Sequence, residues 1–172
     1  MTIVAHSTLA NVYASLDTYI LGTIGGDVST GGSGLAVHLH GVRRFVPPVD
    51  DPWVQVHYDF LGLQQQYMHY ANTTQYATER QGYLQFNVYQ RARLWATRYT
   101  TAAARDSVIS AFPDGKIVSI YDYSNPDDST PDEVGYLHTD GTKEHVQDSG
   151  LQSGVIQHVI QVSCRYFEYF TR

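Results

Sequence analysis

The chain has 172 residues, of which 42% are hydrophobic, and its formal net charge is -6. This length fits one domain with a sizeable core, and the acidic balance disfavours a nucleic-acid-binding role. No apolar stretch approaches the roughly twenty residues of a membrane span, and no basic-then-apolar leader is present, so we expect neither a membrane protein nor a secreted one. The single Cys164 cannot form an internal disulfide and is expected to be a buried, small hydrophobic residue.

An amphipathic helix is the first predicted element. Apolar side chains recur at three- and four-residue spacing from Leu9 to Ile24. Ser7 or Thr8 can cap its start, and Gly25-Gly26 ends it.

Strands and a second helix follow. Apolar and polar residues alternate as in half-buried strands in Trp53–Phe60, Tyr83–Tyr89 and Ile117–Tyr121, whereas the period is helical from about Trp95 to Phe112. The last predicted strand, from about Val155 to Phe170, is roughly three times the usual strand length, so we expect it to bend or to project beyond its sheet. The apolar faces of these elements give the predicted core: Leu16, Ile20, Val54, Val56, Leu84, Phe86, Val88, Ile109, Phe112, Ile160 and Val162.

Two connections are longer than a compact domain normally needs. The first, residues 61–80, contains Tyr67, Tyr70 and Tyr76 but hardly any charge. It suits either a protein-docking surface, because tyrosine gives contact area at low entropic cost, or a poorly ordered hairpin tip. The second, about residues 124–153, contains Asp140-Gly141 between two strand-like runs, a pattern that predicts an extra β-hairpin.

Charge is unevenly distributed along the chain. Between Asp122 and Asp148 eight acidic residues stand against Lys143 alone, so this segment carries all of the net negative charge. It suits either a solvated loop or one half of a contact between copies of the chain, with arginines near the second helix as the other half. The candidate subunit-interface residues are Arg91, Arg93, Arg98, Arg105, Asp127, Asp128, Asp132, Glu133 and Glu144.

Eight histidines raise the possibility of a metal site. His38 and His40 would share one strand face, and His57 could supply a third ligand. The pair resembles part of the cupin motif, but no glutamate follows at the expected short distance. Nor does a Gly-x-Ser-x-Gly elbow occur. We therefore predict no catalytic residues, no metal and no cofactor.

Several segments together resemble one protein family. They are the helix Leu9–Ile24, the proline-led strand entry Pro48–His57, the strand Arg80–Tyr89 running into a helix with Ala102–Asp106, the turn Phe112–Lys116, and the final strand Ile156–Arg165. In their order and pattern they resemble the tail terminator family of long-tailed bacteriophages, which cap a finished tail tube and join it to the head.

The resemblance implies an α+β fold in which an antiparallel or mixed sheet carries two amphipathic helices on one face. It implies a structural protein, not an enzyme, made in the host cytoplasm and located in the virion at the junction of tail and neck. Six copies would form a ring whose partners are the tail tube protein and a neck or head-tail connector protein, with DNA passing through the ring. The alternatives are another neck or head-completion ring protein, and a small metal- or ligand-binding β-rich enzyme.

Overall fold

The computed structural model describes residues 8–26, 31–60, 66–69, 75–91, 97–125, 127, 129–147 and 154–171. These residues form two α-helices and seven strands: α1 (Leu9–Thr23), β1 (Ala36–His38), β2 (Trp53–Asp59), β3 (Gln66–His69), β4 (Gln75–Arg91), α2 (Thr97–Ala111), β5 (Ile117–Tyr121), β6 (Glu133–Gln147) and β7 (Val155–Thr171). The fold is α+β, as predicted.

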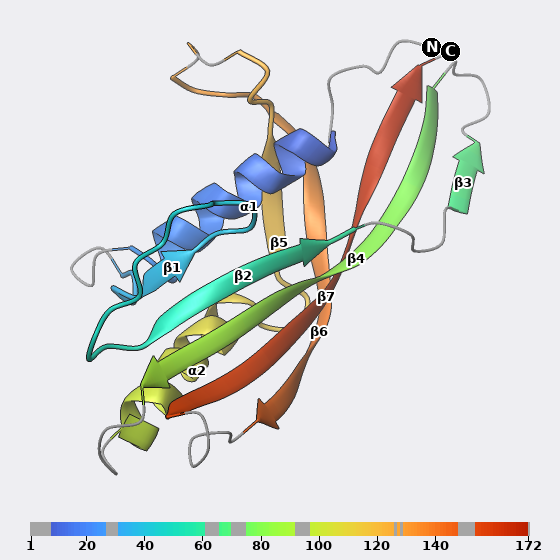
Figure 1. The fold of residues 1–172 in the computed structure, drawn as a ribbon. Coiled ribbons are helices and arrows are strands. Elements are labelled where there is room, and N and C mark those ends of the chain that lie inside the picture. Colours follow the sequence, from blue (N-terminus) through green and yellow to red (C-terminus); the bar gives the residue numbers. More distant parts are fainter. Residues whose placement is uncertain are drawn as a thin grey trace.

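The strands form one mixed sheet in the order β1-β2-β4-β7-β6-β5, with β3 paired to β4 outside this path. β1 runs parallel to β2, and all other pairs are antiparallel. β5 and β1 are therefore the two edges of the main sheet. Figure 1 shows the sheet strongly twisted, and both helices pack on the same face of it.

Both helices end near the residues that the sequence predicts. The Thr8 side chain caps α1 by accepting a hydrogen bond from the Asn11 N–H at 3.3 Å, and the helix closes at Ile24, before Gly25-Gly26. α2 stops before the Pro113-Asp-Gly115 turn, where Gly115 has a positive φ of 73°. Neither helix in the described residues is long and apolar enough to span a membrane.

One face of the sheet and both helices enclose a single core. In β2, β4 and β7 the even-numbered residues point inward, so that Val56, Phe86 and Ile160 lie side by side across three strands. The helices bury Val12, Leu16 and Ile20 from α1 and Ala104 and Val108 from α2 against this face. The predicted core is confirmed, with Ile109 only partly buried at its margin. Its largest unpredicted member is Tyr166, which is 1% exposed.

The predicted hairpin around Asp140-Gly141 is wrong, because Glu133–Gln147 is the single strand β6. Thr139 pairs with Cys164 and Gly141 with Ser163, which leaves Asp140 as the extra residue of a β-bulge. Both halves of β6 pair with β7, whereas the two arms of a hairpin would pair with each other. Gly141 adopts a φ of 127° at the bulge, so the Asp-Gly pair bends the strand without reversing it. The acidic stretch therefore contains an integral strand of the sheet.

β4 and β7 form the longest pairing in the molecule, as expected from the length of the last predicted strand. Each has 17 residues, and every residue of one is paired with a residue of the other without a register shift. Their ends at residues 75–79 and 167–171 run past the helices together with β3 (Figure 1). We call this projecting part, residues 66–69, 75–79 and 167–171, the arm.

Candidate functional site

The first candidate site is the set of charges that the sequence places between subunits. Arg105 on α2 binds Glu144 on β6 within one chain: its Nε donates to Glu144 Oε1 at 2.7 Å, and its Nη2 donates to the other carboxylate oxygen. The Arg105 guanidinium lowers the pKa of Glu144 below its usual range. His158 Nδ1 lies 3.5 Å from the same carboxylate. This pair of opposite charges thus fastens α2 to the sheet of its own chain.

The other predicted interface residues are spread over the molecule. Arg91 is exposed at the end of β4, whereas Asp127, Asp132 and Glu133 are exposed on the connection that leads from β5 into β6. The Tyr136 O–H donates to the Glu133 carboxylate. The Arg98 backbone lies in α2, but its side chain lies outside the description, as do Arg93 and Asp128. Beyond Arg105 and Glu144, the structure brings no two of these residues into an ion pair within the described part of the chain.

The predicted docking residues Tyr67 and Tyr76 both lie in the arm. Tyr67 is in β3 opposite Thr78, and Tyr76 is in β4 opposite Phe170. Tyr70 lies outside the described residues. The segment therefore forms a strand pair on a projecting ribbon, a position from which it can reach a partner protein.

The histidines that suggested a metal site make hydrogen bonds with the backbone. His38 Nε2 donates to the Val42 carbonyl at 2.7 Å, and its ring stacks on Phe45 with centroids 4.8 Å apart. His40 Nδ1 accepts a hydrogen bond from the Tyr58 N–H at 3.1 Å. Burial and the nearby His40 and His38 lower the pKa of His57. Among the described residues, no group of three or more His, Cys, Asp or Glu side chains is placed to hold a metal.

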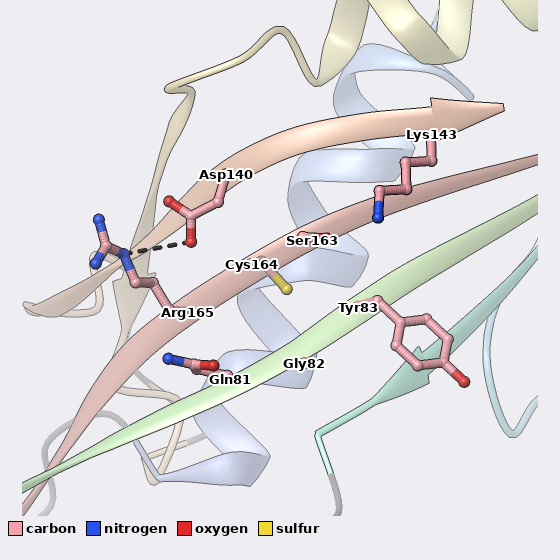
Figure 2. Close-up of a pocket in the computed structure, with 8 residues that line it drawn as sticks. All are labelled: Gln81, Gly82, Tyr83, Asp140, Lys143, Ser163, Cys164 and Arg165. Atoms are coloured by element: carbon pink, nitrogen blue, oxygen red, sulfur yellow. Dashed lines mark ion pairs between the residues drawn. The ribbon is translucent and has the colours of Figure 1, made fainter. Parts of the chain in front are cut away.

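A polar pocket of about 520 Å³ lies across β4, β6 and β7, where Figure 2 shows its lining residues. Arg165 and Asp140 form an ion pair in it, with Nε and Oδ2 3.3 Å apart. Cys164 reaches the pocket but is 2% exposed, and burial raises the pKa of its thiol to about 12. A protonated thiol is a poor nucleophile, and no histidine lines the pocket beside Ser163. The buried thiol of Cys164 is therefore not an activated nucleophile.

A groove of about 290 Å³ runs between α1 and the sheet edge β5; we call it the β5 groove. Its lining residues are Ser15, Thr18, Tyr19, Ile117, Val118, Ser119, Tyr121 and Tyr123. Two side chains of α1 satisfy outward backbone donors along this edge: Ser15 Oγ accepts from the Tyr121 N–H at 2.9 Å, and Asn11 Oδ1 accepts from the Tyr123 N–H at 3.0 Å. The edge backbone is thus partly capped, while the apolar side chains of the groove stay accessible.

Exposed large hydrophobic side chains in the described residues fall into two groups. Ile117, Tyr123 and Tyr136 border the β5 edge, whereas Leu21, Val42, Val46 and Val49 lie on α1 and in the segment that links β1 to β2. We call residues 42–49 of that segment the valine segment. It includes Arg43 and Arg44, both exposed, which the sequence analysis did not single out. Two features of the sequence could have indicated this surface. Two adjacent arginines lie between Val42 and Phe45, and the apolar residues of the segment do not follow the period of a helix or a strand.

No protein-family model matches this chain, and no curated protein sequence matches it.

Proposed function

We propose that the protein is a structural component of a phage tail: a ring of copies that caps the tail tube, ends its polymerisation and offers a surface to the neck. The observation that carries the proposal is the arm. A ribbon extending beyond the helices, with the uncharged strand β3 and its Tyr67 at the edge, suits a contact with another protein better than it suits chemistry. The order of elements, a helix, strands, a second helix and further strands, also supports the proposal.

The two edges of the sheet support self-association. A ring needs heterologous contacts, in which one patch of each copy fits a different patch of the next. β1 and β5 are unlike edges, and each has its own group of exposed hydrophobic residues. This arrangement allows head-to-tail contacts while the arm stays available for a second partner.

The test is to measure particle mass by mass photometry and to image the purified protein by electron microscopy, alone and with tail tube subunits encoded in the same genome. We expect rings of six copies that sit at tube ends and halt tube growth. Monomers under both conditions, or tubes that elongate normally in the presence of the protein, would contradict the proposal.

A second experiment separates the arm from ring formation. Replacing Tyr67 and Tyr76 with serine should leave the ring mass unchanged and should reduce binding to tube ends. The matched control is Tyr83→Ser, which removes a partly exposed tyrosine of the same strand, β4, outside the arm and away from both sheet edges. If the arm variant caps tubes as well as the wild type does, docking through these tyrosines is wrong.

A further inference from the structure

We propose that the valine segment of one copy docks into the β5 groove of the next copy, with Arg43 and Arg44 facing the acidic connection between β5 and β6. The inference rests on the proposed ring and names the contact that builds it. The two surfaces lie at different edges of one sheet, with α1 between them, so the contact is head-to-tail.

The charges of the two surfaces are complementary. No ion pair joins Arg43 or Arg44 to an acidic residue of the described ranges, and none joins Asp127 or Asp132 to a basic one. Three other arginines of this part of the chain, Arg80, Arg105 and Arg165, each have a carboxylate partner. Arg43 and Arg44 on the valine segment and Asp127 and Asp132 on the connection are therefore opposite charges without an ion-pair partner in the described ranges, and they can select the partner and its orientation.

Hydrogen bonds and a ring contact hold the first part of the valine segment against β1. The Val42 N–H donates to the Leu39 carbonyl, with Gly41 at a φ of 78° in the turn between them. The hydrogen bond from His38 to the Val42 carbonyl and the stacking of His38 on Phe45 fix the following residues. Val46 is 89% exposed at the outer side of this structure. A preorganised segment loses little conformational entropy when it docks.

The β5 groove can accept side chains more readily than an added strand. Its edge backbone is partly satisfied by Ser15 and Asn11, as described above. In the valine segment, Pro47 and Pro48 have no N–H group to donate to a strand ladder. The contact is therefore expected to insert valine side chains between Ile117 and Tyr123, with the charged residues arranged around them.

The experiment uses charge reversal at each surface. The first variant carries Arg43→Glu and Arg44→Glu, and the second carries Asp127→Lys and Asp132→Lys. Each alone places like charges across the contact, so we expect assembly to weaken by at least about tenfold at low salt. Mixing the two variants in equal amounts restores opposite charges at every contact, and rings should form again. Particle mass by mass photometry is the readout, with circular dichroism to verify folding.

A matched control and a second type of variant complete the design. Lys143→Glu reverses an exposed basic residue of β6 outside both surfaces, and it should assemble as the wild type does. Val46→Asp tests the apolar part of the contact at a side chain so exposed that folding does not depend on it, and it should prevent assembly.

The outcomes distinguish this inference from the proposed function. A wild-type protein that stays monomeric, alone and with tube subunits, overturns both. Wild-type rings that persist in the Arg43/Arg44 variant, or a mixture of the two variants that fails to assemble, overturn the docking contact and leave the ring intact as a proposal. Loss of assembly in the Lys143 control alone would overturn the docking contact, because it would place the contact elsewhere.

Discussion

Arg105 and Glu144 are joined by a two-pronged ion pair that ties α2 to β6. The two side chains are 32% and 23% exposed, so the pair is partly shielded from solvent. Such a pair holds the helix in register with the strand, because a guanidinium and a carboxylate in this geometry fix each other's orientation. Reversing Arg105 should therefore damage the fold of the single chain before it affects any contact between chains.

This pair predicts an acid-sensitive contribution to stability. Since Arg105 lowers the pKa of Glu144 below 4.5, the carboxylate stabilises the fold at neutral pH, and the contribution is lost as the pH falls through the lowered value. The difference in unfolding free energy between the wild type and Glu144→Gln should be largest near pH 7 and should shrink below about pH 4.5. Urea denaturation at pH 7 and pH 3 measures it. Asp106→Asn, which changes a carboxylate that is 62% exposed, should alter stability by less than about 0.5 kcal/mol.

A second prediction concerns the hydrogen bond from the Tyr58 O–H to Asp17 Oδ1, which is 2.6 Å long and joins β2 to α1. Burial raises the pKa of Asp17, whereas the Tyr58 hydrogen bond opposes that rise. Tyr58→Phe leaves the half-buried carboxylate without this donor, so we expect a loss of about 1 to 3 kcal/mol at pH 7. The loss of unfolding free energy should be smaller at pH 4, because a protonated Asp17 carboxyl is stabilised less by the Tyr58 O–H donor than the carboxylate is. Equal losses at the two pH values would show that Asp17 does not depend on Tyr58.

The core makes a third prediction. Phe86 is fully buried and packs against Phe112, with ring centroids 5.1 Å apart. Phe86→Ala should lower the unfolding free energy by about 3 to 5 kcal/mol, enough to threaten a domain of ordinary stability. Its neighbour Gln85 points to the opposite face of the sheet, and Gln85→Ala should cost less than about 1 kcal/mol. Thermal or urea denaturation of both variants checks the assignment of the two faces.

Gly82 gives a fourth prediction. A Cβ at this position would lie 2.3 Å from the Asp59 carbonyl oxygen and 2.5 Å from Phe60 Cδ1, and the backbone cannot give way as a flexible side chain can. Gly82→Ala should therefore destabilise the fold by about 1 to 3 kcal/mol. Gly22 on α1 offers the opposite case, because a Cβ there meets nothing within 4 Å. Gly22→Ala should stabilise the helix by about 0.5 to 1 kcal/mol, and a melting curve that moves the wrong way in either variant would contradict the structure.

The sequence predicts well those elements whose pattern is local. α1, β2 and β5 follow directly from amphipathic spacing and from caps or turns such as Thr8 and Pro113-Asp-Gly115. The hairpin predicted at Asp140-Gly141 is wrong because that dipeptide is a strong turn signal on its own, whereas β7, the strand that pairs with β6 on both sides of the bulge, comes later in the chain. The local residue pattern gives no information on the free energy that a strand gains by pairing with another strand that is distant in sequence.

The candidate surfaces show the same limit. Counting charges in the sequence indicates the acidic stretch. Only the fold shows that Arg105, which lies 39 positions before Glu144, forms an ion pair with one carboxylate of this stretch. The exposure of Arg43 and Arg44 does not follow from a local pattern, because the apolar residues around them have neither a helical nor a strand period. The exposed fraction of a side chain depends on which helices and strands cover it, and a single sequence does not give that arrangement.

The place of β7 in the sheet has a consequence for folding. It lies between β4 and β6, and among the described strands it alone joins the β1-β2-β4 half to the β6-β5 half. Because β7 follows all of its neighbours in the chain, the ribosome delivers the joining strand after both halves have been made. Until it inserts, the long edges of β4 and β6 are open to other chains, and the distant pairings that close them form slowly. Production of this protein should therefore be most prone to aggregation just before the residues of β7 emerge, and slower translation at that point should not help, since nothing upstream can close the sheet.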